Sequence, residues 1–364
     1  MNDKPFLKII FLTFLFISFI ITSNGQLLKV GIAGLKHDHI NGILQDYKNG
    51  TVQILGIAES DQELVAKYKE KFHLPNTIFF TDLEKMLKNI KPDFVLAYNP
   101  VSEHIDVVEK CAPLGISVMV EKPLSTTLKQ AERMLLLSKK YNIKVLTNFE
   151  TSWYSSYQQV YNTIHSNSEL TPLKKIVTHD GHSGPKEIGC STDFLNWLTD
   201  PVKNGGGALM DFGCYGANLM TWLMHGQTPI AVTAIVRHLK PEMYPKVDDD
   251  ATILVEYPGT TGIIEASWNW PFGIKDLEIF GKAGYLHAIN GNTLEQRLNE
   301  KDALKSTIIA PYKYANNVSY LTDILNGKIV AEDDLSSIKN NIIVMKILDA
   351  ARTSVKEGRR ILLN

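Results

Sequence analysis

A lysine at the end of an apolar segment is the first residue whose position suggests chemistry. Residues 118–120 are apolar, and Glu121, Lys122 and Pro123 follow them. If the apolar residues form a buried strand, Lys122 lies at its carboxyl end, where α/β folds open their ligand crevice. A lysine there can act on a bound molecule. The alternative is that Lys122 only forms an ion pair with Glu121.

The residues that follow the first predicted strand could bind a phosphate group. Gly34 would supply the tight turn of a dinucleotide-binding fold, and the following helix would direct free N–H groups at a pyrophosphate. Leu35 and His37 belong to the same turn. Lys36 and His39 stand where the second and third glycines are usual, so a turn without a ligand remains an open alternative.

Two further strand ends carry polar residues. Glu59 comes about where an acidic residue accepts hydrogen bonds from the adenosine ribose, and its charge would repel a 2′-phosphate, which favours NAD over NADP. Asn99 and Pro100 follow the fourth predicted strand and, with His104, would border a nicotinamide ribose. The alternatives are a surface acid that closes a strand and a histidine that only begins a helix.

These strand ends come together only if the first part of the chain forms a parallel sheet. Short apolar runs alternate there with amphipathic stretches, which is typical of a doubly wound sheet with helices on both faces. We predict strands at residues 28–33, 52–58, 77–80, 94–97, 118–120 and 144–147, and helices at 40–47, 62–72, 82–89, 103–114 and 128–141. Residues 26–147 are therefore predicted to form one domain.

After residue 147 the pattern changes to strands in which apolar and polar residues alternate. This alternation indicates an antiparallel sheet with one face against a core. We predict strands at residues 175–182, 230–238, 251–257, 262–270 and 277–280, and helices at 154–165, 208–224 and 335–358. Residues 148–364 are therefore predicted to form a second α/β domain.

Composition limits the kinds of partner. The 364 residues carry a formal net charge of -1 and no long run of like charge, so we expect no nucleic-acid partner. The spacing of Cys111, Cys190 and Cys214 fits neither a disulfide framework nor a metal site, and we predict no metal. A small molecule is the expected partner.

The first 25 residues are of a different kind. Lys4 and Lys8 precede an apolar run at residues 9–22, and small residues stand before Gln26, as in a secretory signal peptide. The apolar run is short of the ~20 residues that a membrane span needs. We therefore expect cleavage of residues 1–25, no stable span after processing, and an exported protein in the bacterial periplasm.

Several motifs in order resemble the Gfo/Idh/MocA oxidoreductases. The resemblance covers essentially the whole chain after residue 25 and is carried by the residues 30–34, 99–104, 121–123, 205–215, 247–249, 265–268 and 279–284. It implies a Rossmann domain that binds NAD or NADP, and a second domain whose open, mostly antiparallel sheet often mediates homo-oligomers. Tyr215 and Asn218 fit the glucose-fructose oxidoreductase and dihydrodiol dehydrogenase branch.

The resemblance also implies roles for individual residues. Lys122, Asp211 and Tyr215 would be catalytic, with Tyr215 as the general acid or base, Lys122 as its electrostatic partner and Asp211 orienting the substrate. A tyrosine has an ordinary pKa of about 10, so we expect Lys122 to lower it. The residues expected to bind the cofactor are Gly34, Leu35, Lys36, His37, Glu59, Asn99, Pro100, His104, Glu121 and Lys122.

The expected substrate is a sugar or polyol. Trp153, His179, His182 and Trp197 could line its pocket, although each is also credible as ordinary packing. Because an exported protein meets no obvious pool of dinucleotide, a tightly bound cofactor is one solution. Two other functions remain open: cleavage of a glycoside through a transient 3-keto sugar, and carbohydrate binding without catalysis.

Overall fold

A six-stranded parallel sheet forms the first part of the molecule. The computed structural model describes residues 27–363. The strands of this sheet are β1 (Lys29–Ala33), β2 (Gln53–Ala58), β3 (Phe79–Phe80), β4 (Phe94–Ala97), β5 (Ser117–Glu121) and β6 (Val145–Asn148). They run in the order β3-β2-β1-β4-β5-β6, with every pair parallel. The predicted doubly wound sheet is confirmed.

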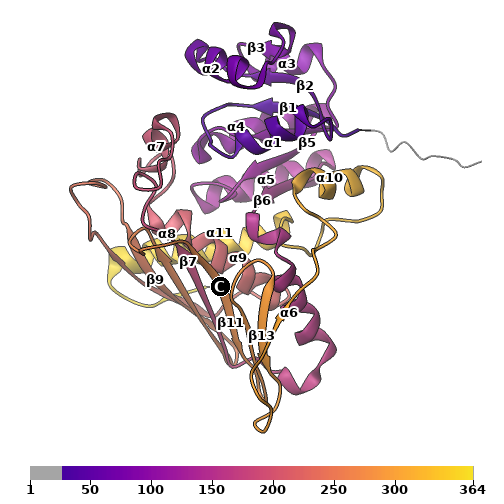
Figure 1. Cartoon of the computed structure of the whole chain (residues 1–364). Coiled ribbons are helices and arrows are strands. Elements are labelled where there is room, and N and C mark those ends of the chain that lie inside the picture. The colour runs from indigo at the N-terminus through magenta and orange to yellow at the C-terminus, as the bar shows by residue number, and fades with distance from the viewer. Residues whose placement is uncertain (1–26, 364) are drawn as a thin grey trace, which may run out of the picture.

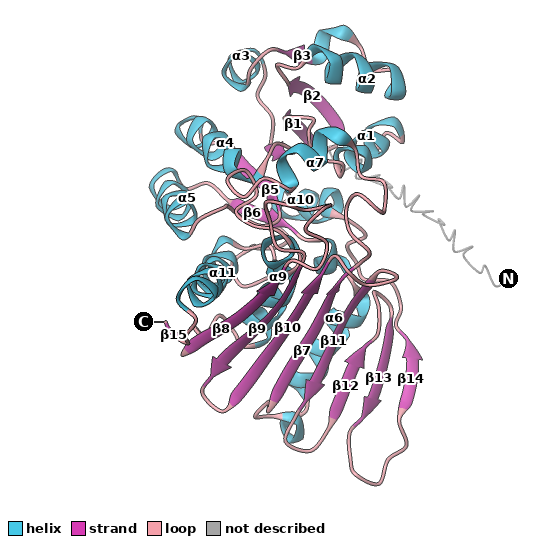
Figure 2. Ribbon diagram, turned by 90° about the vertical axis from the view of Figure 1, so that its left-hand side faces the viewer, coloured by secondary structure: helices cyan, strands magenta, loops and turns pink. Residues whose placement is uncertain are grey.

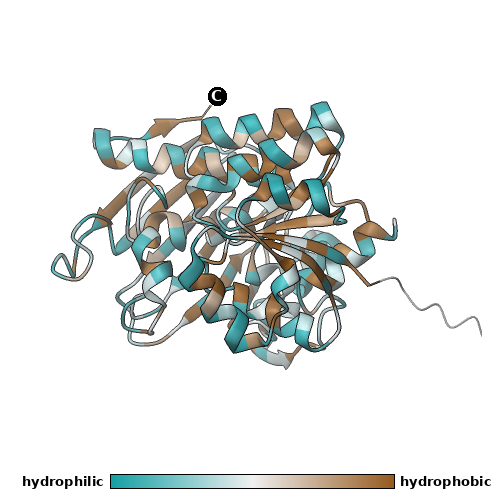
Figure 3. Cartoon of the chain, turned by 90° about the horizontal axis from the view of Figure 1, so that it is seen from above, coloured by the Kyte–Doolittle hydropathy of each residue, from teal (hydrophilic) through white to brown (hydrophobic). Residues whose placement is uncertain are grey.

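Helices on both faces cover this sheet. They are α1 (Ile40–Lys48), α2 (Gln62–Phe72), α3 (Leu83–Asn89), α4 (His104–Cys111) and α5 (Leu128–Tyr141). Before α2, α3 and α5 stands a residue whose side chain accepts a free backbone N–H group of the first helical turn. These residues are Asp61, Asp82 and Thr127, respectively. In Figure 3, apolar strands lie between helices whose outer turns carry hydrophilic residues. The continuous apolar strands of the sequence are explained by burial on both faces.

A nine-stranded sheet forms the second layer. Its strands are β7 (Lys175–Gly181), β8 (Ala231–Arg237), β9 (Asp250–Tyr257), β10 (Thr260–Ser267), β11 (Ile274–Phe280), β12 (Tyr285–Ala288), β13 (Thr293–Arg297), β14 (Lys305–Ile308) and β15 (Ile361–Leu362). Their order is β14-β13-β12-β11-β7-β10-β9-β8-β15. Only the β7–β10 pair is parallel, so the predicted, mostly antiparallel sheet is confirmed.

Helices cover one face of this second sheet and leave the other bare. The helices of this part are α6 (Ser155–Ser166), α7 (Thr192–Leu198), α8 (Ala208–Asp211), α9 (Gly213–Leu223), α10 (Asn317–Leu325) and α11 (Ile338–Glu357). Figure 2 shows the strands in front, with α6, α9 and α11 behind them. Figure 1 shows the parallel sheet and its helices stacked above this layer.

One predicted helix is interrupted. The sequence predicted a single helix at residues 208–224, but α8 ends at Asp211 and α9 begins at Gly213. The backbone N–H of Tyr215 donates to the carbonyl of Phe212 at 3.0 Å, while the carbonyl of Asp211 accepts from the Lys122 ammonium at 3.0 Å. A tertiary contact therefore takes the acceptor that a continuous helix would have used.

Six helices and strands were not predicted: β12, β13, β14, β15, α7 and α10. In β13 only Leu294 is buried, and in β14 no residue is buried, so these two strands lack the alternation that identifies a strand against a core. The helix α10 lies over the first layer, where Val318 and Leu321 pack in the same apolar cluster as Val30 and Ile32. The domain boundary predicted at residues 147–148 stays a prediction.

The predicted signal peptide, residues 1–25, lies outside the described residues. No helix within residues 27–363 combines the length and apolarity needed to cross a membrane.

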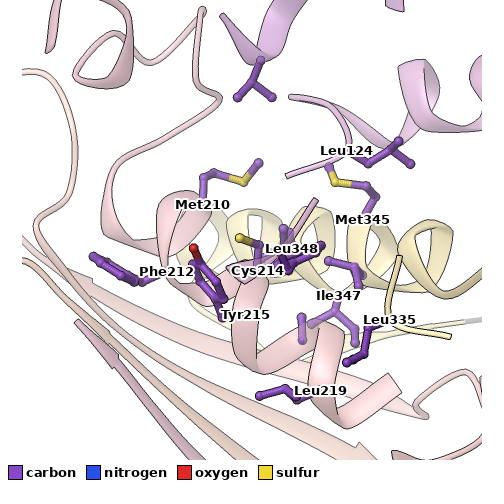
Figure 4. Close-up of a cluster of buried hydrophobic side chains, with 14 of the residues drawn as sticks. Leu124, Met210, Phe212, Cys214, Tyr215, Leu219, Leu335, Met345, Ile347 and Leu348 are labelled. Carbon is purple, nitrogen blue, oxygen red and sulfur yellow. The ribbon is translucent and has the colours of Figure 1, made fainter. Parts of the chain in front are cut away.

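A glycine brings α9 close to the second sheet. Every residue of α9 is buried, and Figure 4 shows its side chains meeting those of α11 in a common cluster. A Cβ atom on Gly216 would lie 2.3 Å from the Thr178 Oγ1 and 2.7 Å from a methyl carbon of Ile264. The two elements can approach this closely only because the side chain is absent.

We predict that Gly216→Ala destabilises the protein. The added methyl group has no room against β7 and β10, and overpacking of this kind costs about 1–3 kcal/mol. Gly42→Ala in α1 is the matched control, because nothing lies within 4 Å of its Cβ position and the exchange should stabilise by about 0.5–1 kcal/mol. Urea unfolding measures both. Equal stabilities for the two variants would contradict the close packing.

Candidate active site

The predicted cofactor residues gather at one edge of the parallel sheet. Strand β1 lies between β2 and β4, and the chain reverses its direction of winding at the β1–β4 pair. A pocket lies outside the carboxyl ends of these strands. It is lined by Gly34, Lys36, Glu59 and Asn99 together with residues that begin α3 and α4. A crevice at such a switch point is where doubly wound sheets bind their ligands.

The turn after β1 requires a glycine. Gly34 has a φ of 82°, and a Cβ atom on it would lie 2.8 Å from the Cβ of Asn99. The Glu59 carboxylate accepts the backbone N–H of Leu35 at 2.9 Å and that of Asp61 at 2.9 Å. Glu59 thus stabilises the turn through hydrogen bonds to its backbone, a structural role that the sequence analysis did not predict. Its proposed contact with a ribose stays a prediction.

The second part of the chain holds this turn. Asp38 accepts hydrogen bonds from the Ser191 backbone N–H at 2.8 Å and from its hydroxyl at 2.6 Å. The Trp197 indole N–H donates to the carbonyl of Lys36 at 3.0 Å. His37 is 1% exposed and lies against the ring of Trp197. Burial keeps the pKa of His37 well below its ordinary value, and the neighbouring His39 lowers it further.

Lys122 and Asp211 form a buried ion pair between the two layers. The Lys122 Nζ lies 2.5 Å from the Asp211 Oδ1, and the two side chains are 8% and 7% exposed. The Trp268 indole N–H donates to the other carboxylate oxygen, Oδ2, at 2.9 Å. Trp268 belongs to a motif that carried the family resemblance but was not among the predicted site residues.

The charges of this pair stabilise each other. Burial by itself raises the pKa of the Asp211 carboxyl, but the facing Lys122 ammonium and the two hydrogen bonds bring it below its ordinary value. Burial likewise lowers the pKa of Lys122, and the Asp211 carboxylate more than restores it. Both groups are therefore charged at neutral pH.

Tyr215 lies between two lysines but is not acidified by them. The centroid of its ring is 5.0 Å from the Lys122 Nζ and 4.7 Å from the Lys275 Nζ. Burial raises the pKa of the phenol well above its ordinary value, and the carboxylate of Glu150 raises it further. This differs from the expectation that Lys122 lowers that pKa, because Asp211 already balances the charge of Lys122.

Lys275 and Glu150 are site residues that sequence reasoning missed. The Lys275 ammonium pairs with the Glu150 carboxylate, and Lys275 is the second residue of β11, seven residues after Trp268. The sequence offered no signal, since both residues follow predicted strands as ordinary charged surface groups would. Figure 4 shows the Tyr215 hydroxyl pointing away from the second sheet.

The other cofactor candidates lie around the end of β5. Glu121 is 2% exposed and contacts Asn148 Nδ2 at 2.8 Å and His39 Nδ1 at 2.9 Å. His104 is fully buried, with Nδ1 3.2 Å from the carbonyl of Leu124, and its Nε2 has no hydrogen-bond partner among the residues that the structure describes. Pro100 is buried at the start of the following turn. These residues thus lie beside the pocket that Gly34, Lys36, Glu59 and Asn99 line, rather than in its wall.

The four ring residues that could line a sugar pocket are dispersed. His182 lies in the site, 4.9 Å from the ring of Phe212 between centroids. Trp197 supports the turn after β1, and Trp153 packs on Tyr320 with centroids 5.3 Å apart. The remaining ring, that of His179, pairs with Asp276 on the second sheet.

Two family descriptions match the chain. Residues 28–149 match an oxidoreductase family with an NAD-binding Rossmann fold, and residues 157–287 match the GFO/IDH/MocA C-terminal domain. The chain belongs to the Gfo/Idh/MocA oxidoreductase family. The predicted resemblance is confirmed.

Curated relatives of this family member are distant. A trans-1,2-dihydrobenzene-1,2-diol dehydrogenase of Xenopus laevis is 27% identical over 220 residues, which are 59% of this chain and 60% of that protein. A D-xylose 1-dehydrogenase [NADP(+)] of Haloarcula marismortui is 25% identical over 46% of this chain and 45% of its own length. The chain thus spans about half to two thirds of the length of such relatives.

Solved structures share the fold over nearly the whole chain. An aldose-aldose oxidoreductase of Caulobacter crescentus, complexed with glycerol, has a TM-score of 0.78 at 21% identity, covering 93% of this chain and 100% of that one. An inositol dehydrogenase homolog of Azotobacter vinelandii, complexed with NAD+, has a TM-score of 0.79 at 14% identity, covering 93% and 98%. At these identities the likeness establishes the fold.

We predict that Asp211→Asn destabilises the protein by roughly 3–5 kcal/mol, because it leaves a buried ammonium without its counter-charge. Pairing it with Lys122→Met should recover part of that loss. The exposed pair Arg133 and Glu109 provides the control, where Glu109→Gln should cost less than about 1 kcal/mol. Denaturant unfolding measures all three variants.

The effect of Asp211→Asn should also depend on pH. Because folding lowers the pKa of Asp211, its contribution to stability is full above the unfolded pKa of about 3.9 and is lost as pH falls through the folded value. A constant difference between wild type and variant down to the acid transition would contradict the pairing.

Proposed function

We propose that this protein is an NAD(P)-dependent oxidoreductase that transfers hydride between a nicotinamide ring and a hydroxyl or carbonyl carbon of a sugar or polyol. The observation that carries the proposal is the buried Lys122–Asp211 pair, which lies at the end of β5, beside the crevice of the parallel sheet and next to Tyr215. The names of the relatives, which specify a diol, a pentose and an aldose, support this substrate class.

The residues present fit a dinucleotide. Gly34 leaves backbone space at the turn, where a side chain would collide with Asn99. The buried Asn99 Oδ1 and His104 Nε2 have no hydrogen-bond partner within the described chain, and buried polar atoms of this kind call for a ligand or water. Gly34, Leu35, Lys36 and Glu59 would hold the phosphates and adenosine, with Asn99, Pro100, His104, Glu121 and Lys122 at the nicotinamide half.

NAD is the cofactor that we propose in preference to NADP. Both carboxylate oxygens of Glu59 accept backbone N–H groups of the turn, so its negative charge is fixed beside the pocket rather than free to swing away. A 2′-phosphate would meet that charge. The bound cofactor would supply the hydride acceptor or donor, and the chain's own residues would handle the proton.

Lys122 is suited to bind the reacting oxygen. An ammonium has three N–H donors, and within the described chain Nζ donates to the carbonyl and to the Oδ1 of Asp211. One donor remains for a substrate oxygen. Asp211 and Trp268 fix the direction in which that donor points, so Asp211 is a positioning residue in this scheme.

Tyr215 is suited to supply the proton. Because burial raises the pKa of its phenol, Tyr215 carries its proton at neutral pH and is ready to donate it to a carbonyl oxygen that becomes a hydroxyl. In the reverse direction Tyr215 must first lose its own proton, because only the phenolate can accept the proton of a substrate hydroxyl, and the raised pKa of the phenol makes this direction more favourable at high pH.

We predict that Lys122→Met and Tyr215→Phe each lower kcat by roughly 10²–10⁴ for NAD-dependent oxidation of a panel of aldoses and polyols, the range typical of lost proton transfer or oxyanion stabilisation. Tyr215→Phe should still bind NAD, which can be measured by the quenching of tryptophan fluorescence. The control is Tyr161→Phe on α6, whose ring stacks on Trp222 away from the site.

Three outcomes of that experiment would contradict the proposal. Wild-type rates in either site variant would remove the residue from the mechanism. Release of free sugar from a glycoside without net change of NAD would favour the 3-keto route. A wild-type protein that binds sugar but no dinucleotide would favour carbohydrate binding without catalysis.

We also propose a homo-oligomer that forms through the bare face of the second sheet, after export to the periplasm. On β8, β9 and β11 the residues that alternate with buried ones leave apolar side chains on this face: Ile235 is 63% exposed, Leu254 39% and Phe280 40%. Exposed apolar groups gathered on one face are typical of protein interfaces. A second copy of the chain is the partner expected from the family.

We predict that Leu254→Arg reduces the mass of the particle in solution to that of the monomer, because an arginine at the centre of an apolar interface would be buried without a partner. Leu136→Arg on α5, an exposed leucine outside this face, is the control and should leave the assembly unchanged. Light scattering after gel filtration measures both. A monomeric wild type would contradict the proposal.

A further inference from the structure

Two histidines and a glutamate meet beside the cofactor crevice. His37, His39 and Glu121 each offer one ligand atom, and these atoms all lie within 4.8 Å of one another. Two of the residues belong to the turn after β1, and the third ends β5, so the cluster joins segments 82 residues apart. The sequence predicted no metal site because that prediction relied on local spacing.

The surrounding structure holds two of the three side chains in place. The other oxygen of Glu121 accepts a hydrogen bond from Asn148 Nδ2 at 2.8 Å, and outer contacts of this kind orient the carboxylates that bind metals. His37 packs against Phe194, with ring centroids 4.6 Å apart. Its Nδ1 accepts the backbone N–H of His39 at 3.1 Å, and a metal ion bound by this ring would replace that hydrogen bond, because a neutral imidazole has only one nitrogen free to accept. The ring of His37 is therefore fixed beside that of His39.

The third proposed ligand, His39, is accessible to solvent. The side chain of His39 is 45% exposed, whereas that of Glu121 is 2% exposed. His39 Nδ1 contacts Glu121 Oε2 at 2.9 Å, so a cation would replace one proton shared between these atoms. The cluster is thus built on two buried side chains and is reached past one that can move.

We propose that His37, His39 and Glu121 bind a divalent transition-metal ion, with zinc as the best match. Imidazole nitrogens suit zinc and its neighbours, whereas magnesium and calcium prefer oxygen ligands alone. Three protein ligands leave a fourth position open, as in zinc sites that bind water or a substrate oxygen. This site goes beyond the proposed hydride transfer, although it shares Glu121 with the residues proposed for the nicotinamide half of the cofactor.

A second histidine pair provides an internal control. His165 and His225 face each other on the far side of the second layer, with Nε2 atoms 2.7 Å apart. Both side chains are exposed, and neither histidine pairs with a carboxylate within residues 27–363, so we expect at most weak binding there. Loss of zinc binding from His225→Ala would show that this pair, rather than the buried cluster, is the metal site.

The test is a zinc titration of the purified full chain after dialysis against a chelator. We expect wild type to bind one equivalent of Zn²⁺ with a dissociation constant of micromolar or below, as measured by competition with a zinc indicator. His39→Ala and Glu121→Gln should each weaken binding by at least about tenfold, since each removes a ligand. His225→Ala should bind as wild type does.

Binding of Co²⁺ offers a second readout that does not require catalysis. A site with two nitrogens, one carboxylate and a water in tetrahedral geometry gives visible absorption, and His39→Ala should abolish it while circular dichroism shows an unchanged fold. The proposal is overturned if wild type takes up no stoichiometric zinc, if His39→Ala binds it equally well, or if only His225→Ala loses it. NAD binding is measured separately, so failure here leaves the oxidoreductase proposal standing.

Discussion

The buried ion pair between Lys122 and Asp211 determines how the two layers of this protein meet. Lys122 directly follows a strand of the parallel sheet, and Asp211 ends a short helix of the second layer. Neither charge can be buried alone without a large cost in solvation. The pair is satisfied only when both layers are in register. The groups to which the proposed function gives a role are thus assembled by the same contact that stabilises the interface, and mispositioning one layer would disturb both stability and the proposed site.

The surroundings of Asp211 show how the second layer holds this position. The Asp248 carboxylate accepts the backbone N–H groups of Gly207 and Leu209 at 2.9 and 2.7 Å, and a Cβ on Gly207 would overlap the Asp248 carbonyl. The glycines that precede α8 therefore let its first turn lie directly on the loop before β9. The indole N–H of Trp268 holds the carboxylate oxygen of Asp211 that does not contact Lys122. The acidic side chain reaches the lysine because the backbone around it has almost no freedom.

The sequence pattern predicted those elements whose form depends on which faces are buried. Continuous apolar runs identified the strands of the parallel sheet, because helices cover both of its faces. Alternation of apolar and polar residues identified β7 to β11, because only one face of their sheet is covered. The break between α8 and α9 could not be predicted, since it depends on Lys122 taking the Asp211 carbonyl as acceptor. Lys275 and Glu150 escaped notice for a related reason: their positions near Tyr215 follow from how the layers pack. Family motifs identified Lys122, Asp211 and Tyr215, but the raised pKa of Tyr215 arises from burial that no motif records.

The turn after β1 is held from the opposite half of the chain, through Ser191 and Trp197. If the proposed dinucleotide sits so far under that turn that it can leave only when these hydrogen bonds break, cofactor exchange is tied to separation of the layers rather than to the departure of product. In the proposed oxidoreductase this is the physical condition for ping-pong kinetics, in which one substrate reduces a resident cofactor and a second reoxidises it. A protein that works outside the cytoplasm would then need one cofactor molecule per lifetime rather than one per turnover.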